Sequence, residues 1–310
     1  MKQITVLVPT YNEEGNIEKL YNRTKKIFNE QLSSYVCKIL FVDNCSTDNT
    51  RNLIENLCDK DNTVMAIFNL KNFGFARSQF NGLQNAPGDA VILMYADCQD
   101  PPEVIPEFVK KWEAGANVVC GVKKRSKENL IMFLIRKAYY KLIKKISDIN
   151  HINQFDGFGL YDKSFIRILS SINDKNPYFR GIVAEYGKNI QEVVYEQGKR
   201  TAGKSSFNLL SYYDFAMLGI TSYSKRIIHF CTIMGAVLSV ISIVIAIITF
   251  IKKIQNWDSF PVGSAAMQIG IFFLGAIQIF FIGFIGEYLV NMNTRIMNHP
   301  LVIEEKRINF

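Results

Sequence analysis

The sequence predicts an α/β protein with a mostly parallel sheet, followed by a hairpin of two membrane-spanning helices. Short apolar runs alternate with amphipathic helical stretches from the N-terminus to about residue 122, which is the pattern of a parallel sheet covered by helices. Acidic and amide residues follow several of these runs. Two later runs, 227–251 and 262–286, contain no Asp, Glu, Lys or Arg, and each exceeds the roughly 20 apolar residues that cross a bilayer.

The apolar periodicity places the elements of the sheet in order along the chain. Strands are expected at 4–8, 38–42, 63–68, 90–94 and 117–122, and helices at 15–29, 47–58, 75–84 and 102–113. The polar residues that follow these strands then lie at one edge of the sheet, where open α/β sheets bind ligands.

The strand at 90–94 leads into the most informative stretch, 94–103. Asp97 and Gln99 supply hard oxygen donors, which suit Mg²⁺ or Mn²⁺ completed by substrate phosphates. Prolines at 101 and 102 can open a helix, with Asp100 as its N-cap. The alternative is a strand-to-helix turn with a capping aspartate and no metal.

The first two strand-to-helix turns argue against a dinucleotide fold. The first turn carries Glu13 and Glu14 where a glycine-rich phosphate loop would lie, and carboxylates there repel phosphate. The second turn begins with Asp43, which could accept hydrogen bonds from a base or ribose. The alternative for Asp43 is a local turn that caps the next helix, although the residues at 46–48 already offer capping groups.

The formal charge of +8 indicates an anionic partner. The apolar runs favour lipid head groups or a phosphorylated substrate over nucleic acid. Basic residues that include Lys123 and Arg125 dominate 123–145, at near-helical spacing with apolar residues. This stretch fits a membrane surface or an anionic substrate, or else a solvated helix over the sheet. The cysteines show no CxxC pair, so sulfur ligation of a metal has no support.

The predicted organisation has four parts. Residues 1–206 form the catalytic domain, 207–226 an interfacial amphipathic helix, 227–290 the transmembrane hairpin with spans at about 227–251 and 262–288, and 291–310 a tail. Because Met1 and Lys2 lead straight into a strand, no signal peptide is expected. The catalytic domain and both termini are therefore expected in the cytosol, at the cell (plasma) membrane.

An ordered series of motifs resembles the family-two inverting glycosyltransferases with the Rossmann-like GT-A fold, and more narrowly the polyprenyl-phosphate glycosyltransferases. The series extends over nearly the whole chain. Its members are VPTYNEEGNI within 4–17, VDNCSTDNT at 42–50, NLKNFGFARSQFNGL at 69–83, ADCQDPPE at 96–103, QFDGFGLYDK at 154–163, FRG at 179–181, RTAGKSSF at 200–207, GITSYS at 219–224 and GEYL at 286–289.

The resemblance implies roles for individual residues. Asp97 and Gln99 would hold the divalent metal, and Asp156 would be the acidic residue on the acceptor side. The nucleotide sugar would be held by Pro9, Tyr11, Glu13, Asp43, Asn72 and Gly74. The acceptor phosphate would be held by Lys123, Arg125, Arg200, Lys204 and Ser205.

Two departures from the family pattern bear on the site. The family commonly has an Asp-x-Asp pair where this chain has Tyr95 and Asp97, which leaves fewer carboxylates for the metal. Many relatives read Gly-Asp-Phe-Arg where this chain has Asp156-Gly157-Phe158-Gly159. The acidic residue is therefore displaced by one position, and the arginine is missing.

The expected reaction moves a hexose or N-acetylhexosamine from a nucleotide sugar to polyprenyl phosphate with inversion, with UDP favoured by the resemblance. The product would supply lipid-linked sugar for modification of cell-envelope glycans. The alternatives are another lipid acceptor such as diacylglycerol, and a non-catalytic scaffold that binds nucleotide sugars. The sugar and a homo-oligomeric state are left open.

Overall fold

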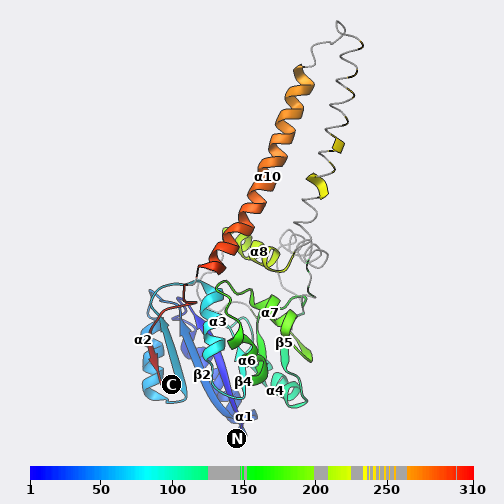
Figure 1. Ribbon diagram of the computed structural model, residues 1–310. Helices are drawn as coiled ribbons and strands as arrows, with labels where there is room; N and C mark the ends of the chain where they lie inside the picture. The colour runs from blue at the N-terminus through cyan, green and yellow to red at the C-terminus, as the bar shows by residue number, and fades with distance from the viewer. Residues whose placement is uncertain are drawn as a thin grey trace.

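The structure is a computed structural model of the 310-residue chain (Figure 1). The residues that it describes are 1–124, 147, 149, 152–198, 209–224, scattered positions between 233 and 255, 264–297 and 299–310. The predicted phosphate ligands Arg125, Arg200, Lys204 and Ser205 lie outside the described residues, as do most of the basic stretch at 123–145 and most of the first apolar run.

An eight-stranded mixed sheet forms the centre of the described part of the chain, in the order β7-β5-β6-β4-β1-β2-β3-β8. Its strands are β1 (Gln3–Thr10), β2 (Val36–Asp43), β3 (Val64–Asn69), β4 (Ala90–Leu93), β5 (Val118–Lys123), β6 (Gly159–Asp162), β7 (Ile190–Tyr195) and β8 (Glu304–Ile308). β1 pairs in parallel with β2 on one side and β4 on the other. The strand order therefore reverses at β1, and the carboxyl ends of β1 and β4 lie at the switch point where open α/β sheets bind ligands.

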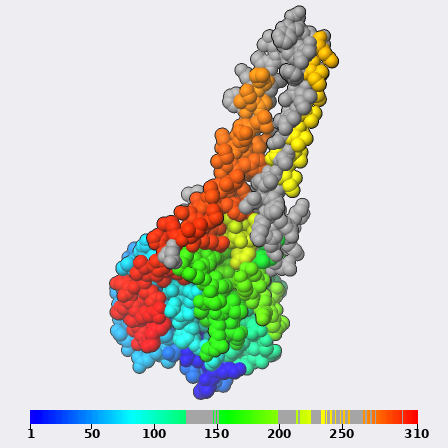
Figure 2. Space-filling view, viewed as in Figure 1, coloured from blue at the N-terminus to red at the C-terminus, as the bar shows by residue number. Residues whose placement is uncertain are grey.

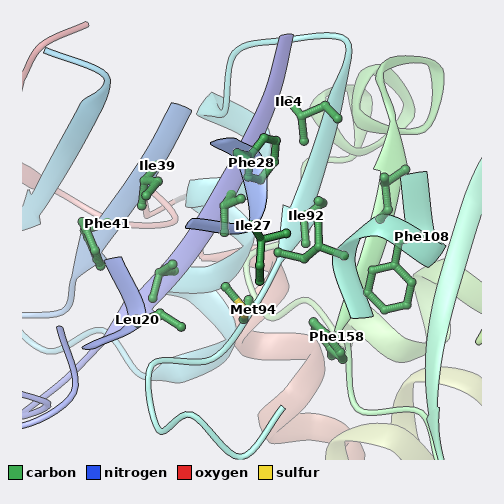
Figure 3. Packing of buried hydrophobic residues seen from close by; sticks show 14 of the residues in the cluster. Ile4, Leu20, Ile27, Phe28, Ile39, Phe41, Ile92, Met94, Phe108 and Phe158 are labelled. Carbon is green, nitrogen blue, oxygen red and sulfur yellow. The ribbon is translucent and has the colours of Figure 1, made fainter. Parts of the chain in front are cut away.

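Helices cover both faces of this sheet. They are α1 (Ile17–Gln31), α2 (Thr50–Lys60), α3 (Phe75–Asn85), the short η1 (Pro102–Val104), α4 (Ile105–Glu113), α6 (Lys163–Ser171) and α7 (Phe179–Tyr186). Figure 3 shows Leu20, Ile27 and Phe28 of α1 packed against the strands, with Phe108 and Phe158 nearby. A second buried cluster fills the opposite face, where Phe80 and Leu83 of α3 and Phe165 of α6 lie. Apolar packing on both faces holds the strands in place, and with them the carboxyl edge of the sheet.

The sequence-predicted strands and helices are confirmed to within a few residues up to β5, but the sheet is more mixed than expected. β6 runs antiparallel to β4 and β5, and β8 runs antiparallel to β3. The 291–310 segment, expected as a tail, contains the end of a helix and then β8, which closes the edge of the sheet. Figure 2 shows the C-terminal residues, in red, covering one side of the α/β domain.

Two further helices lie at one end of the α/β domain, where α8 lies across the end and α10 extends away from it (Figure 1). They are α8 (Leu209–Tyr223), within the segment predicted to be interfacial, and the long α10 (Ser264–Ile296). The Tyr288 hydroxyl donates to the Ser224 carbonyl at 2.6 Å, and the Asn291 side chain donates to the Thr221 hydroxyl at 2.8 Å. These bonds join the foot of α10 to the end of α8. Judged over the described residues alone, no helix is long and apolar enough to cross a membrane.

We predict that β8 contributes substantially to the stability of the catalytic domain. Asn309 donates to the carbonyls of Cys58 and Val64 at 2.9 and 2.8 Å, and the Leu70 N–H donates to the Ile303 carbonyl at 2.9 Å. Each such bond contributes about 1 kcal/mol, so deletion of 303–310 should lower the melting temperature by about 5 °C or more. Glu305→Ala, which removes only an exposed ion pair with Arg51, should leave it almost unchanged. Equal melting temperatures for the deletion and the wild type would contradict this role.

Candidate active site

The turns after β1 and β2 are locked to each other at the carboxyl edge. The Asn12 N–H donates to the Ser46 hydroxyl at 2.9 Å, and the Thr47 N–H donates to the Asn12 side chain at 2.8 Å. Asn12 and Cys45 both have positive φ, 56° and 63°, a conformation that asparagine adopts more readily than most residues. The two turns are therefore bonded into one unit at the carboxyl edge.

Three predicted nucleotide ligands lie in β1 and in the turn that follows it. Pro9 is buried in β1 and pairs with Val42, while Tyr11 exposes 36% of its surface at the edge. The Glu13 N–H donates to the Thr50 hydroxyl at 2.8 Å, and the Glu13 carboxylate accepts from the Asn16 side chain at 2.6 Å. Of these residues, the ring of Tyr11 is the one most available to a ligand.

Asp43, the last residue of β2, takes part in a local turn. It is fully buried, and its two carboxylate oxygens accept from the Ser46 hydroxyl at 2.5 Å and the Ser46 N–H at 3.1 Å. Burial raises the pKa of Asp43, and the bonds from Ser46 oppose that rise. The sequence interpretation assigned Ser46 to helix capping and left Asp43 free. In the structure Ser46 bonds to Asp43 instead, and at the start of α2 the Thr50 N–H donates to the Asp48 carboxylate at 3.0 Å.

Asparagines hold the next loop in place. The Asn72 side-chain oxygen accepts from the Asn44 side chain at 2.8 Å and from the Gly74 N–H at 2.9 Å. Asn44 also accepts from Asn69 and from the Phe73 N–H, each at 3.1 Å. Gly74 has a φ of +87°, which a side chain would strain. Asn44 and Asn69 are site residues that the sequence analysis missed, although Asn44 directly follows Asp43.

The loop at 94–101 after β4, called the metal loop below, carries the predicted metal ligands. The Gln99 N–H donates to an Asp97 carboxylate oxygen at 3.1 Å, and the Gln99 side-chain oxygen accepts from Gln197 at 2.9 Å. Cys98, between them, has a φ of 56°, so the loop turns sharply and keeps Asp97 and Gln99 together.

These residues fit a divalent metal of the kind that phosphates help to hold. Asp97 and Gln99 offer hard oxygens, and an amide oxygen that accepts one bond keeps a second lone pair. Among the described residues there is no group of three or more His, Cys, Asp or Glu that could hold a metal alone. Mg²⁺ commonly binds through one or two carboxylates and substrate phosphates, so the donor set suits a metal that arrives with a nucleotide.

A cluster of buried charges lies beside this loop. The Lys123 ammonium and the Asp156 carboxylate form an ion pair of 2.5 Å, with only 16% and 18% of their side chains exposed. Burial lowers the pKa of Lys123, but the neighbouring charges of Asp156 and Asp100 outweigh it and the pKa is raised. The structure therefore brings together two residues predicted for separate roles, the acceptor-side acid and a phosphate ligand.

Asp100 belongs to this cluster, and its predicted capping role is wrong. Its side chain is 1% exposed and accepts a 2.5 Å hydrogen bond from the Tyr195 hydroxyl. The short helix η1 begins after Pro101 without a side-chain cap. Burial, with the nearby Asp156 charge, raises the pKa of Asp100 to about 7. The charge of Arg180 also acts on this cluster, where it lowers the pKa of Lys123. The sequence analysis missed Tyr195 and Arg180 because it did not predict β7 and α7.

The segment after β7 also contacts the metal loop. The Gly198 N–H donates to the Gln99 carbonyl at 2.8 Å, and the Gln197 side chain donates to the Gln99 side-chain oxygen at 2.9 Å.

Comparisons with known proteins agree with the motif series. Residues 5–169 match the family described as glycosyl transferase family 2. The chain is 32% identical over 308 residues to a bactoprenol glucosyl transferase of Shigella phage SfII, covering 98% of both proteins. It is 32% identical over 290 residues to a prophage bactoprenol glucosyl transferase homolog of Escherichia coli K12, covering 93% of both.

A solved structure shares the fold. Glucosyl-3-phosphoglycerate synthase from Mycobacterium tuberculosis, in complex with Mn²⁺, UDP and phosphoglyceric acid, is 16% identical with a TM-score of 0.50. The likeness covers 71% of this chain and 76% of that one. Mannosyl-3-phosphoglycerate synthase from Rubrobacter xylanophilus gives the same TM-score at 14% identity, covering 71% and 72%. At these identities the likeness supports the GT-A fold.

We predict that Asp97→Ala abolishes metal-dependent nucleotide binding and lowers turnover by about a hundredfold or more, because it removes the one carboxylate of the pair. Titration with nucleotide and Mn²⁺, followed by calorimetry, measures the binding directly. Asp89→Ala is the matched control, because Asp89 precedes β4 at the opposite end of the same strand and bonds to the Gln3 N–H at 2.9 Å. Wild-type nucleotide affinity in Asp97→Ala would remove the metal site from this loop.

We also predict that Lys123 and Asp156 act as a pair. Lys123→Met should raise the KM for the acceptor, and Asp156→Asn should lower kcat. The double variant should lose less kcat/KM, expressed as a free energy, than the sum of the losses in the two single variants. Each single change removes one charge of the ion pair and leaves its largely buried partner unpaired, and that cost disappears when both charges are removed. Lys163→Met, at the far end of the sheet beside Asp89, serves as the control. Strictly additive losses would show that the two residues act independently.

Proposed function

This chain belongs to glycosyl transferase family 2 and is a glycosyltransferase, and we propose that it transfers a hexose or N-acetylhexosamine from a nucleotide sugar to polyprenyl phosphate. The observation that carries the proposal is the full-length similarity to bactoprenol glucosyl transferases, which covers 98% of both chains and therefore includes the apolar C-terminal part. The cluster of Lys123 and Asp156 beside the metal loop supports it, since a phosphate acceptor needs a cation near the reacting sugar.

The nucleotide sugar is proposed to lie across the carboxyl ends of β1, β2 and β4, with UDP as the favoured nucleotide. The ring of Tyr11 is exposed at this edge, and Asn72 is bonded to Asn44 just after β2. Asp43, the last residue of β2, is buried against Ser46 beneath them. The M. tuberculosis synthase of the same fold binds UDP and Mn²⁺, which supports a similar donor here. Asp97 and Gln99 would hold Mg²⁺ or Mn²⁺, and the metal would neutralise charge on the leaving diphosphate.

The acceptor requires no strong general base. The second pKa of a phosphate monoester is about 6, so polyprenyl phosphate is largely dianionic at neutral pH. One phosphate oxygen forms the bond to the anomeric carbon while the bond from that carbon to the diphosphate breaks. The nucleoside diphosphate leaves with the bonding electrons, and this single displacement inverts the anomeric carbon. The protein supplies position and charge. Lys123 would attract the phosphate, and Asp156 would orient Lys123. The motif with Arg200, Lys204 and Ser205 is proposed to add further phosphate contacts.

The acceptor's lipid tail supports placing the enzyme at a membrane. Withdrawing that tail from a bilayer costs about 0.8 kcal/mol per CH₂ group, so the site must come to the lipid surface. We propose spans at about 227–251 and 262–288, an interfacial helix within 207–226, and a catalytic domain with both termini in the cytosol at the plasma membrane. Along α10 large apolar side chains are solvent-exposed, Met267 at 70%, Ile279 at 72% and Phe280 at 67%, which supports a lipid environment.

A donor panel tests the proposal. Purified protein is incubated with Mn²⁺, undecaprenyl phosphate and one radiolabelled donor at a time, from UDP-glucose, UDP-N-acetylglucosamine, UDP-galactose and GDP-mannose. We expect label from a UDP-sugar to enter the organic phase, in a product whose anomeric configuration by NMR is opposite to that of the donor. Asp97→Ala should give none. Parallel reactions with diacylglycerol identify a different acceptor, and nucleotide-sugar binding without any transfer would identify a scaffold. Either result would overturn the proposal.

A further inference from the structure

Two neighbouring backbone carbonyls, those of Asp156 and Gly157, each accept a hydrogen bond from a tyrosine hydroxyl. They lie in the loop just before β6, which is called the acceptor-side loop below. The Tyr95 hydroxyl donates to the Asp156 carbonyl at 2.7 Å, and the Tyr161 hydroxyl donates to the Gly157 carbonyl at 2.5 Å. Tyr161 is fully buried in β6, whereas Tyr95 is half-buried in the loop that leads to Asp97. The orientation of both peptide groups is therefore fixed by side chains from outside the loop.

The loop backbone is shaped to receive the Tyr95 hydroxyl. Gly157 has a φ of +121°, and a Cβ atom at this position would lie 2.5 Å from the Tyr95 oxygen. A larger residue at 157 and the hydroxyl at 95 thus exclude each other. The Tyr95 ring is itself packed against Phe75, at the start of α3, with ring centroids 5.5 Å apart.

The same backbone orientation directs the Asp156 carboxylate. One carboxylate oxygen accepts from the Phe158 N–H at 3.2 Å, and the other pairs with Lys123 at 2.5 Å. Asp156 is therefore held at two places, its backbone carbonyl by Tyr95 and its carboxylate by the Phe158 N–H and Lys123. Loss of the bond from Tyr95 would free the peptide between Asp156 and Gly157 to turn, and so loosen the backbone that carries this carboxylate.

We propose that Tyr95 is a positioning residue, which ties the metal loop to the acceptor-side loop and sets the place of Asp156 for transfer to the lipid phosphate. An ionised carboxylate at 95 could not do this, because it accepts hydrogen bonds and has none to donate to a carbonyl. Position 95 therefore acts through a hydrogen-bond donor in this chain, and not as a second metal carboxylate. The inference rests on the proposed function, since it assigns Asp156 to acceptor transfer.

Tyr95→Phe is the direct test, because it keeps the ring on Phe75 and removes only the hydroxyl. We expect kcat for lipid transfer to fall about tenfold, the effect of losing one well-placed hydrogen bond. The KM for the nucleotide sugar and the Mn²⁺-dependent affinity for UDP should stay within about twofold of wild type. Rates are divided by the number of UDP-binding sites in each preparation, so that misfolded protein does not count. Tyr35→Phe, which removes a hydroxyl bonded to Glu113 away from the site, is the matched control.

Two further variants separate positioning from other roles. Tyr95→Asp should lose at least as much lipid transfer as Tyr95→Phe, whereas a second metal carboxylate would preserve or raise activity and tighten Mn²⁺ binding. In an Asp156→Asn background, Tyr95→Phe should cost no further activity, because its effect runs through Asp156.

The outcomes are distinct from those for the proposed function. A wild-type protein that transfers no sugar to polyprenyl phosphate refutes the proposed function. Three results with an active wild type would refute the positioning role alone. They are wild-type activity in Tyr95→Phe, wild-type or higher activity in Tyr95→Asp, and additive losses when Tyr95→Phe is combined with Asp156→Asn.

Discussion

The ion pair between Lys123 and Asp156 is the interaction on which the arrangement of the site depends. It joins the end of β5 to the loop before β6, and Asp100 and Tyr195 pack beside it. Removing such charges from water costs several kcal/mol per ion, which the mutual attraction of a pair only about offsets. The pair is therefore a poor source of stability. The proposed reaction offers a better explanation, because the pair keeps a cation and a carboxylate desolvated and at a fixed separation beside the metal loop.

The sequence was most informative where the physical signal was local. The buried runs that became β1 to β5 are continuous and apolar, and the polar residues after β1, β2 and β4 met at one edge as parallel strands require. Signals failed where a strand was short or polar. β6 spans only Gly159–Asp162, and β8 reads Glu304–Ile308 with charged residues at most positions. β8 is recognisable only once the free edge of β3 is known. Tyr195 was missed for the same reason, because it ends β7, a strand with polar and exposed positions.

Individual site residues show a similar division. That Asp97 and Gln99 lie together follows from their spacing after a strand. The pairing of Lys123 with Asp156 could not be predicted, because the residues are far apart in sequence and meet only through the antiparallel contact of β5 with β6. Asp43 and Asp100 show how ambiguous a single acid is. One was expected to be free and bonds to Ser46, while the other was expected to cap a helix and is buried against Tyr195.

The charge balance of the site suggests why a tyrosine can stand where the family commonly has an aspartate. In the proposed reaction a lipid phosphate and a diphosphate approach one another at an edge of the sheet that already holds the carboxylates of Asp97 and Asp156. A further carboxylate at 95 would strengthen metal binding in the absence of substrate but would repel both anionic substrates at close range. A neutral hydroxyl removes that repulsion and would leave the metal dependent on substrate oxygens for its remaining ligands. On the proposed mechanism, binding of metal and nucleotide is therefore strongly coupled, because the diphosphate would provide the free energy that a second carboxylate otherwise provides to the metal.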